Sequence, residues 1–111
     1  MNAIEAAKAH KGVFMVEFLP WLENNEEVFL TFCNLADAIW NAGRTHYSAR
    51  TIVEKMRFDH AIREVGGKFK INDHLSPDLG RLYALLKPSR LDMFRFKRGG
   101  GFREYVRKCS Q

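Results

Sequence analysis

Residues 24–43 read NNEEVFLTFCNLADAIWNAG, and this stretch decides the fold class. Its apolar residues recur at intervals of three and four, which aligns them along one face of a helix. That face comprises Val28, Phe32, Leu35 and Ile39, widened by Phe29, Ala36 and Trp40. Asn24 and Glu27 have the spacing of a capping box, and Gly43 can adopt the left-handed conformation that ends a helix. The sequence therefore predicts an amphipathic helix over residues 24–42.

Two further helices are expected downstream. Ser48 can cap a helix that runs to about Val65. Its apolar face would comprise Ile52, Val53 and Met56. Ser76-Pro77-Asp78 is a typical helix start, with the serine hydroxyl as the cap and proline at the first helical position. This helix, over residues 77–87, would end before Pro88 and bury Leu79, Leu82, Tyr83 and Leu86.

The segment between these two helices has the pattern of a short strand. Gly66-Gly67 would stop the second helix, and Lys68-Phe69-Lys70-Ile71 then alternates basic and apolar residues. Asn72-Asp73 supplies residues that favour a turn. We therefore expect a mainly α, compact helical domain with a short β-hairpin, in a helix-turn-helix or winged-helix-like arrangement.

The ends of the chain are less regular. Residues 2–10 are Ala-rich and predict a short helix, whereas the apolar strap, residues 13–22, is either a strand up to Phe18 or irregular, because Pro20 limits a helix there. A chain of 111 residues predicts one core, here residues 1–98, followed by a Gly-hinged basic tail, residues 99–111.

Composition points to a soluble protein in a reducing compartment. Hydrophobic residues make up 46% of the chain and aromatic residues 13%, which argues against global disorder. The two cysteines, Cys33 and Cys109, make no disulfide framework. Glu17 and Pro20 interrupt the apolar strap, which is also too short to span a bilayer. We expect a cytoplasmic location and no membrane partner, and the sequence carries no prediction of oligomeric state.

Charge is divided unevenly along the chain. Residues 1–43 carry two basic and six acidic groups, whereas residues 44–111 carry sixteen basic and seven acidic groups. A basic half of this kind favours a polyanionic partner, nucleic acid above all, although charge also keeps small proteins soluble. The candidate binding cations are Arg50, Arg57, Lys68, Lys70, Arg95, Lys97, Arg98, Arg103 and Arg107.

Each group of cations has an alternative explanation. Arg50 and Glu54 have the i,i+4 spacing of a helix surface pair. After residue 93 the cations alternate with aromatic residues, a composition typical of stacked bases on a phosphate backbone. The same pattern fits an amphipathic strand and helix with buried rings, or a surface that binds acidic protein groups.

Catalytic and metal-binding patterns are incomplete. The four histidines lie at least about fourteen residues apart, so the short spacings of zinc ligands are missing. Asn72-Asp73-His74 is similar to a fragment of a nuclease motif in which His74 would be the general base. The second part of that motif, which contains another histidine and an asparagine, is missing from the sequence. Gly99-Gly100-Gly101 lacks the spacing of a phosphate loop. We expect no enzyme activity, no cofactor and no metal.

Several segments resemble a family of small proteins encoded by phages and prophages. The resemblance covers residues 44–96, and its most specific part is Phe69-Lys70-Ile71-Asn72-Asp73. Further matching positions are Tyr47, Ser48, Ile52, Glu54, Arg57, Gly67, Arg81, Leu82, Tyr83 and Phe94. Phe58, Gly80 and the basic tail depart from the family's pattern. The resemblance implies a mobile-element origin rather than a mechanism.

Two non-enzymatic functions follow from that origin and from the charge. The first is a DNA-binding regulator that contacts phosphates through the basic half of the chain. The second is an anti-CRISPR-like inhibitor that binds and blocks a host defence protein complex, through the apolar strap or the basic tail.

Overall fold

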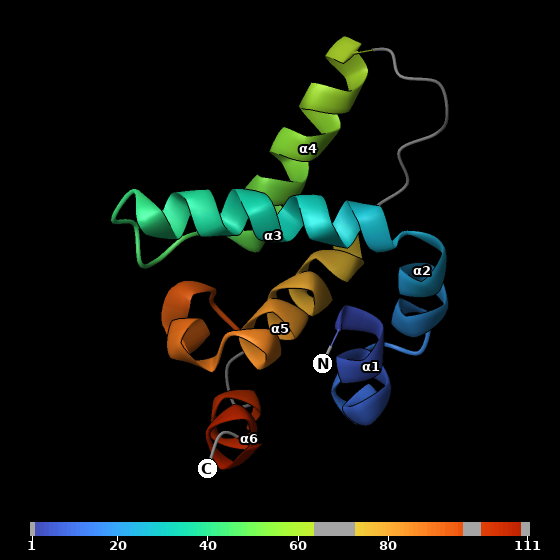
Figure 1. Ribbon diagram of the computed structural model, residues 1–111, viewed down its shortest axis with the longest axis vertical. Coiled ribbons are helices and arrows are strands. Elements are labelled where there is room, and N and C mark those ends of the chain that lie inside the picture. Colours follow the sequence, from blue (N-terminus) through green and yellow to red (C-terminus); the bar gives the residue numbers. More distant parts are fainter. Residues whose placement is uncertain (1, 64–72, 97–100, 110–111) are drawn as a thin grey trace.

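A computed structural model describes residues 2–63, 73–96 and 101–109 of the chain, and Figure 1 shows their arrangement. The elements, with η for 3₁₀-helices, are α1 (Ala3–Ala9), η1 (Lys11–Val13), α2 (Phe18–Asn24), α3 (Glu26–Asn41), α4 (Ala49–Arg63), η2 (Asp73–Leu75), α5 (Ser76–Leu86), η3 (Pro88–Met93) and α6 (Phe102–Cys109). The expected mainly helical fold is confirmed. No strand occurs in the described ranges, and the expected strand at Lys68–Ile71 lies outside them.

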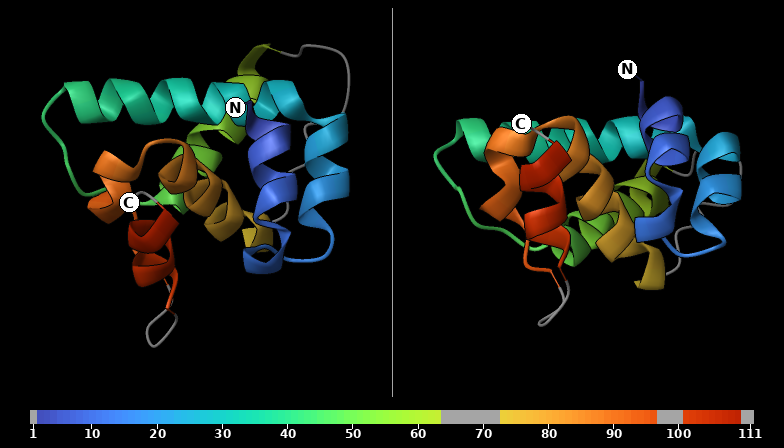
Figure 2. Two further views of the ribbon diagram at one scale, coloured as in Figure 1. Left: turned by 60° about the horizontal axis from the view of Figure 1, so that its bottom comes forward. Right: turned by 90° about the horizontal axis from the view of Figure 1, so that it is seen from below.

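Helix α5 is the centre of the fold. It packs against α1, α3, α4 and η3, lies between α3 and α6 in Figure 1, and has α1 beside it in both views of Figure 2. Of its predicted stripe, Leu79, Leu82 and Tyr83 have no exposed surface, and Leu86 is partly buried against the same core. Helix α4 crosses α3 and extends away from the rest of the domain (Figure 1).

Helix α3 matches its predicted face but not its predicted start. The fully buried residues are Phe32 and, from those expected to widen the face, Phe29 and Ala36, whereas the rest of the predicted face is partly buried against the core. The capping box does not form, because α2 leads almost directly into α3 and the amides of Asn24 and Asn25 donate back to carbonyls of α2. The prediction that α3 ends at a left-handed Gly43 is confirmed.

The end of α3 is a left-handed cap at Gly43. Its φ of 94° favours a residue without a Cβ. The Gly43 amide donates to the carbonyl of Trp40, and the Arg44 amide donates to that of Ile39, which is the paired hydrogen bonding of a Schellman motif. The connector to α4 therefore leaves α3 in a defined direction.

Part of the apolar strap is helical, which corrects the expectation that Pro20 would limit a helix there. Helix α2 begins at Phe18, so Pro20 occupies its third position, where an amide has no acceptor within the helix. The first helical hydrogen bond comes from the Trp21 amide, at 3.2 Å from the Glu17 carbonyl. Phe18 and Leu22 then enter the core with no exposed surface.

Helices α4 and α5 begin differently from each other. Ser48 caps α4 as predicted, with its Oγ accepting from the Thr51 amide at 3.2 Å. Ser76 does not cap α5, because η2 runs straight into the helix and makes Leu75 the flanking residue. Asp78, the acid of the predicted Ser-Pro-Asp helix start, is fully buried and accepts from the Met15 amide at 3.0 Å and Arg81 Nη1 at 2.6 Å. Desolvation raises the pKa of Asp78.

The end of the chain forms an amphipathic helix. Val106 of α6 is buried in a small cluster with Ala84 and Leu91. Tyr105 Oη lies 2.5 Å from His10 Nδ1 of α1, which links the two ends of the domain. None of the helices in the described ranges is both long and apolar enough to cross a bilayer.

Candidate functional site

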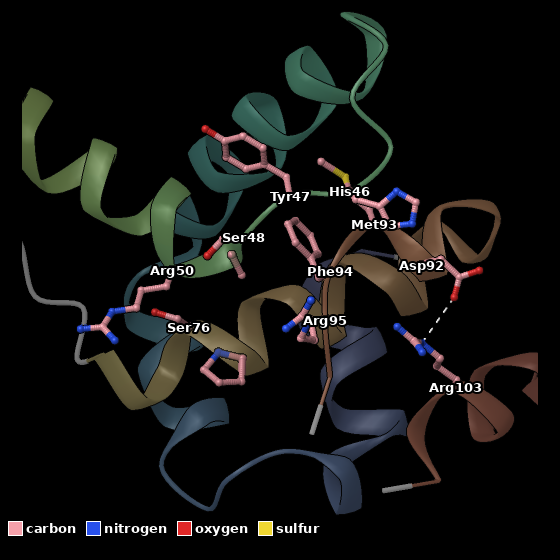
Figure 3. Close-up of a pocket in the computed structure, with 12 residues that line it drawn as sticks. His46, Tyr47, Ser48, Arg50, Ser76, Asp92, Met93, Phe94, Arg95 and Arg103 are labelled. Atoms are coloured by element: carbon pink, nitrogen blue, oxygen red, sulfur yellow. Dashed lines mark ion pairs between the residues drawn. The ribbon is translucent and has the colours of Figure 1, made fainter. Parts of the chain in front are cut away.

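A hydrogen bond between two distant segments creates a groove. The Tyr47 amide donates to the carbonyl of Met93 at 2.8 Å, which holds the α3–α4 connector beside the chain that leaves η3. The groove between these segments has a volume of about 810 Å³ and is open to solvent (Figure 3). It is lined by His46, Tyr47, Ser48, Ala49, Arg50, Ser76, Pro77, Asp92, Met93, Phe94, Arg95 and Arg103.

Phe94 anchors one wall of the groove in the core. It is 2% exposed, and its ring contacts those of Phe32 and Tyr83, with centroids 5.7 and 5.6 Å away. Gly80 makes room for it, since a Cβ there would lie 3.3 Å from Phe94 Cδ2 and 3.6 Å from Ala49 Cβ. The absence of a side chain at Gly80 thus lets Phe94 and the start of α4 lie close to α5.

Three of the predicted cations meet at this groove. Arg50 comes from α4, Arg95 from the segment after η3, and Arg103 from α6. Asp92 is the single carboxylate among the lining residues. The fold therefore gathers three positive side chains, distant in sequence, around one concave surface.

Two of these arginines already have carboxylate neighbours. Arg50 Nε lies 3.4 Å from Glu54 Oε1, which confirms the expected surface pair, and Arg103 Nε lies 3.4 Å from Asp92 Oδ1. All four side chains are about half exposed or more, so water screens both pairs strongly. Arg95 is exposed and has no carboxylate partner in the described part of the chain. The groove keeps a net positive charge.

The remaining predicted cations are not placed in the groove. Arg57 is half-buried on α4 and Arg107 is exposed on α6, and neither lines the groove. The other four, Lys68, Lys70, Lys97 and Arg98, lie outside the described residues.

Sequence reasoning missed several polar residues of the groove. His46 and Asp92 carry no local signal, because they approach the site only through the contact between the connector and η3. Ser76 did carry a signal but was interpreted as a helix cap. In the structure its Oγ is buried and has no hydrogen-bond partner within residues 2–63, 73–96 and 101–109.

A hydrogen-bond network behind the groove joins α3, α5 and η3. Oδ1 of Asp37 accepts from Tyr83 Oη at 2.8 Å, Lys87 Nζ at 2.6 Å and Arg90 Nη1 at 2.8 Å. Burial, together with the hydrogen bond to Asp37 and the charge of Asp37, raises the pKa of Tyr83 to about 12, although the hydrogen bond and the charge of Arg90 act in the opposite direction. The Arg90 guanidinium also lies 5.2 Å from the ring centroid of Trp40. Since three donors occupy the carboxylate, this network holds the groove wall in place rather than offering a reactive group.

The histidine of the nuclease hypothesis lies beside an acid. His74 Nε2 is 3.3 Å from Glu17 Oε1, and both side chains are about half exposed. Among residues with described side chains, no group of three His, Cys, Asp or Glu is arranged to hold a metal ion.

The apolar strap is only partly available to a partner. Val16 is 91% exposed and Met15 is 41% exposed, whereas Phe18 and Leu22 are fully buried. Met15 and Val16 border a hollow of about 350 Å³ together with Lys11, Phe14, Leu19 and Pro20.

Comparison with known proteins does not assign a family. The chain matches no protein-family model, and no similar curated protein or solved structure was found.

Proposed function

We propose that this protein is a non-enzymatic, cytoplasmic nucleic-acid-binding protein that contacts the phosphate backbone through the groove described above. The observation that carries the proposal is the convergence of Arg50, Arg95 and Arg103 around a surface with one carboxylate. Arginine forms strong, often bidentate hydrogen bonds with phosphate oxygens, and each phosphate that it neutralises releases counterions. The resemblance to phage and prophage proteins favours a DNA-binding regulator.

The shape of α4 supports a helix-turn-helix-like mode of binding. This helix extends away from the body of the domain (Figure 1), as a helix that enters a major groove must do. Arg50 and Arg57 are seven residues apart on it and share one face. In this proposal α4 lies in the major groove, the three groove arginines contact the flanking phosphates, and Lys68 and Lys70 contact further phosphates.

Salt dependence provides the primary test. Fluorescence anisotropy should show binding to labelled duplex or single-stranded DNA at low salt, and the affinity should fall steeply as salt rises. Each neutralised phosphate contributes about 0.9 to the slope of log affinity against log salt in duplex DNA. Replacing Arg95 with glutamine should therefore lower the slope by about one. Absence of binding at low salt, or binding without a salt slope, would contradict the proposal.

Two charge variants separate the groove from total charge. Asp92→Asn removes the carboxylate beside Arg103 and should tighten binding, because that arginine becomes fully available. Lys108→Gln is the matched control for Arg95→Gln, because Lys108 is an exposed cation that does not line the groove. If Lys108→Gln weakens binding as much as Arg95→Gln does, net charge rather than the groove determines affinity.

A second candidate function rests on the apolar strap. The exposed Val16 and Met15 beside an apolar hollow could bind a host protein, as an anti-CRISPR-like inhibitor does. Under this alternative, Val16→Asp would abolish capture of a protein partner from host lysate and leave DNA binding unchanged. Recovery of nucleic acid alone in that experiment would count against it.

A further inference from the structure

We propose that one end of the groove, where α4 and α5 begin, is a site for a single phosphate group, bound by the Ser76 hydroxyl, the N-terminus of α4 and Arg95. The inference rests on the proposed function, since the site lies within the same groove. It adds to that function a defined position at which one phosphate is recognised.

Ser76 provides the strongest indication of a missing ligand. The residue is 3% exposed and lines the groove, yet its Oγ has no hydrogen-bond partner among the residues that the structure describes. Buried polar groups without a partner are rare, and each one calls for an explanation such as an absent ligand. Figure 3 shows the hydroxyl pointing toward the side of the groove that Arg50 occupies. A phosphate oxygen on that side of the groove would supply the acceptor that the hydroxyl lacks.

The start of α4 adds a second source of attraction. This helix has 15 residues, so its N-terminus carries a substantial positive partial charge. Ser48 satisfies the Thr51 amide, while the amide of Ala49, the first residue of the helix, has no acceptor within the helix. Contact between Ala49 and the bare backbone of Gly80 brings this turn against α5, the helix that begins with Ser76. Helix N-termini of this kind bind phosphate groups well.

Arg95 supplies the formal charge from the opposite wall. It is exposed, lines the groove and has no carboxylate partner within the described ranges. The one lining carboxylate, Asp92, is paired with Arg103 and lies on the far side of Figure 3 from Ser76. An anion at the Ser76 end is therefore attracted by Arg95 and kept apart from Asp92.

The groove is larger than a single phosphate. Its volume of about 810 Å³ leaves space for a nucleotide chain to continue toward Arg103 once one phosphate is held at the Ser76 end. The phosphate could be an internal phosphodiester or the terminal phosphate of a nucleic-acid strand. Both present the same oxygen atoms to Ser76.

Amide chemical shifts test the site directly. Inorganic phosphate, titrated at constant ionic strength against chloride, should shift the amide resonances of Ala49, Arg50 and Ser76 in a saturable manner. Ser76→Ala should weaken phosphate binding by about tenfold, since it removes a hydrogen bond to a charged group. The same variant should raise the thermal midpoint, because it also removes an unsatisfied buried hydroxyl. Ser89→Ala, at an exposed serine outside the groove, is the matched control.

A ligand site differs from a packing defect in that Ser76→Ala should lower the affinity for phosphate while it raises the thermal stability. The inference is overturned if Ser76→Ala leaves phosphate affinity unchanged, or if chloride produces the same shifts. Oligonucleotide binding without phosphate shifts at these amides would overturn the site and leave the proposed function standing. Phosphate-induced shifts at these amides without oligonucleotide binding would overturn the proposed function and leave the phosphate site standing. Tighter binding of a 5′-phosphorylated than of a 5′-hydroxyl strand would support the site and assign it to a terminal phosphate, and equal binding would support it as an internal phosphodiester site.

Discussion

Replacement of Asp37 with alanine should destabilise the fold more than the partial exposure of its side chain implies. The substitution removes the acceptor of the Tyr83 hydroxyl, and Tyr83 has no exposed surface through which water could replace it. A buried donor left without a partner costs about 1–3 kcal/mol. Loss of the half-exposed Lys87 pair adds at most about 1 kcal/mol. We therefore expect the free energy of unfolding to fall by about 2–3 kcal/mol.

Urea unfolding at pH 7, followed by circular dichroism, measures this loss. Asp59→Ala is the matched control, because Asp59 pairs with Lys55 at 3.2 Å on the exposed face of α4. Its loss should stay below about 0.5 kcal/mol, as is usual for an i,i+4 surface pair. A change of similar size in both variants would show that the Asp37 network adds nothing beyond an ordinary surface charge.

The pH dependence of the same variant has a defined sign. Desolvation opposes ionisation of Asp37, but hydrogen bonds from Lys87 and Tyr83 and the charges of Lys87 and Arg90 outweigh it, so its pKa is lowered from 3.8. A carboxyl with a lower pKa in the folded state contributes stability above its unfolded-state pKa and loses it as pH falls through the folded-state pKa. The difference between the natural protein and Asp37→Ala should therefore be constant near neutral pH and shrink below pH 3.8. A difference that acid leaves unchanged would refute the reasoning.

Three further predictions test other parts of the fold. Burial, aided by the charge of Asp37, raises the pKa of Cys33 to about 12, so a thiol reagent at mildly alkaline pH should label the exposed Cys109 quickly and Cys33 only after unfolding. Gly43→Ala should cost about 1 kcal/mol, seen as a lower urea midpoint, because the φ of 94° disfavours a Cβ. Tyr105→Phe removes the hydrogen bond to His10 of α1 and should speed hydrogen exchange in α6 while leaving exchange in α3 unchanged.

The helices that could be predicted are those whose signals are local. The spacing of apolar residues in α3 and α4 is a property of the chain over a few turns, and the caps at Ser48 and Gly43 involve residues within a few positions of each other. Neither the apolar spacing nor the caps depend on which distant segments of the chain pack against these helices. For that reason the mainly helical fold and most of the α3 and α5 faces could be predicted correctly.

The errors occurred where one element runs directly into the next. Asn24 and Asn25 have the chemistry of helix caps, but α2 ends beside them and takes up their side-chain amides. Ser76 has the same chemistry, but η2 makes it the first residue of the helix rather than the residue before it. Pro20 was expected to limit a helix, and its position in the first turn removes the conflict. For Asn24 and Ser76 the residue type was correctly associated with the start of a helix, but its position relative to the first helical residue was predicted wrongly.

The sequence by itself determined the amphipathic helices and the basic character of residues 44–111, because periodicity and charge are properties of the chain alone. Only the tertiary structure decided which cations share a surface. The Tyr47–Met93 hydrogen bond and the burial of Phe94 bring Arg50, Arg95 and Arg103 to one groove, while Arg107 of the same basic tail faces elsewhere. Such convergence depends on contacts between residues far apart in the chain, and no local pattern encodes it.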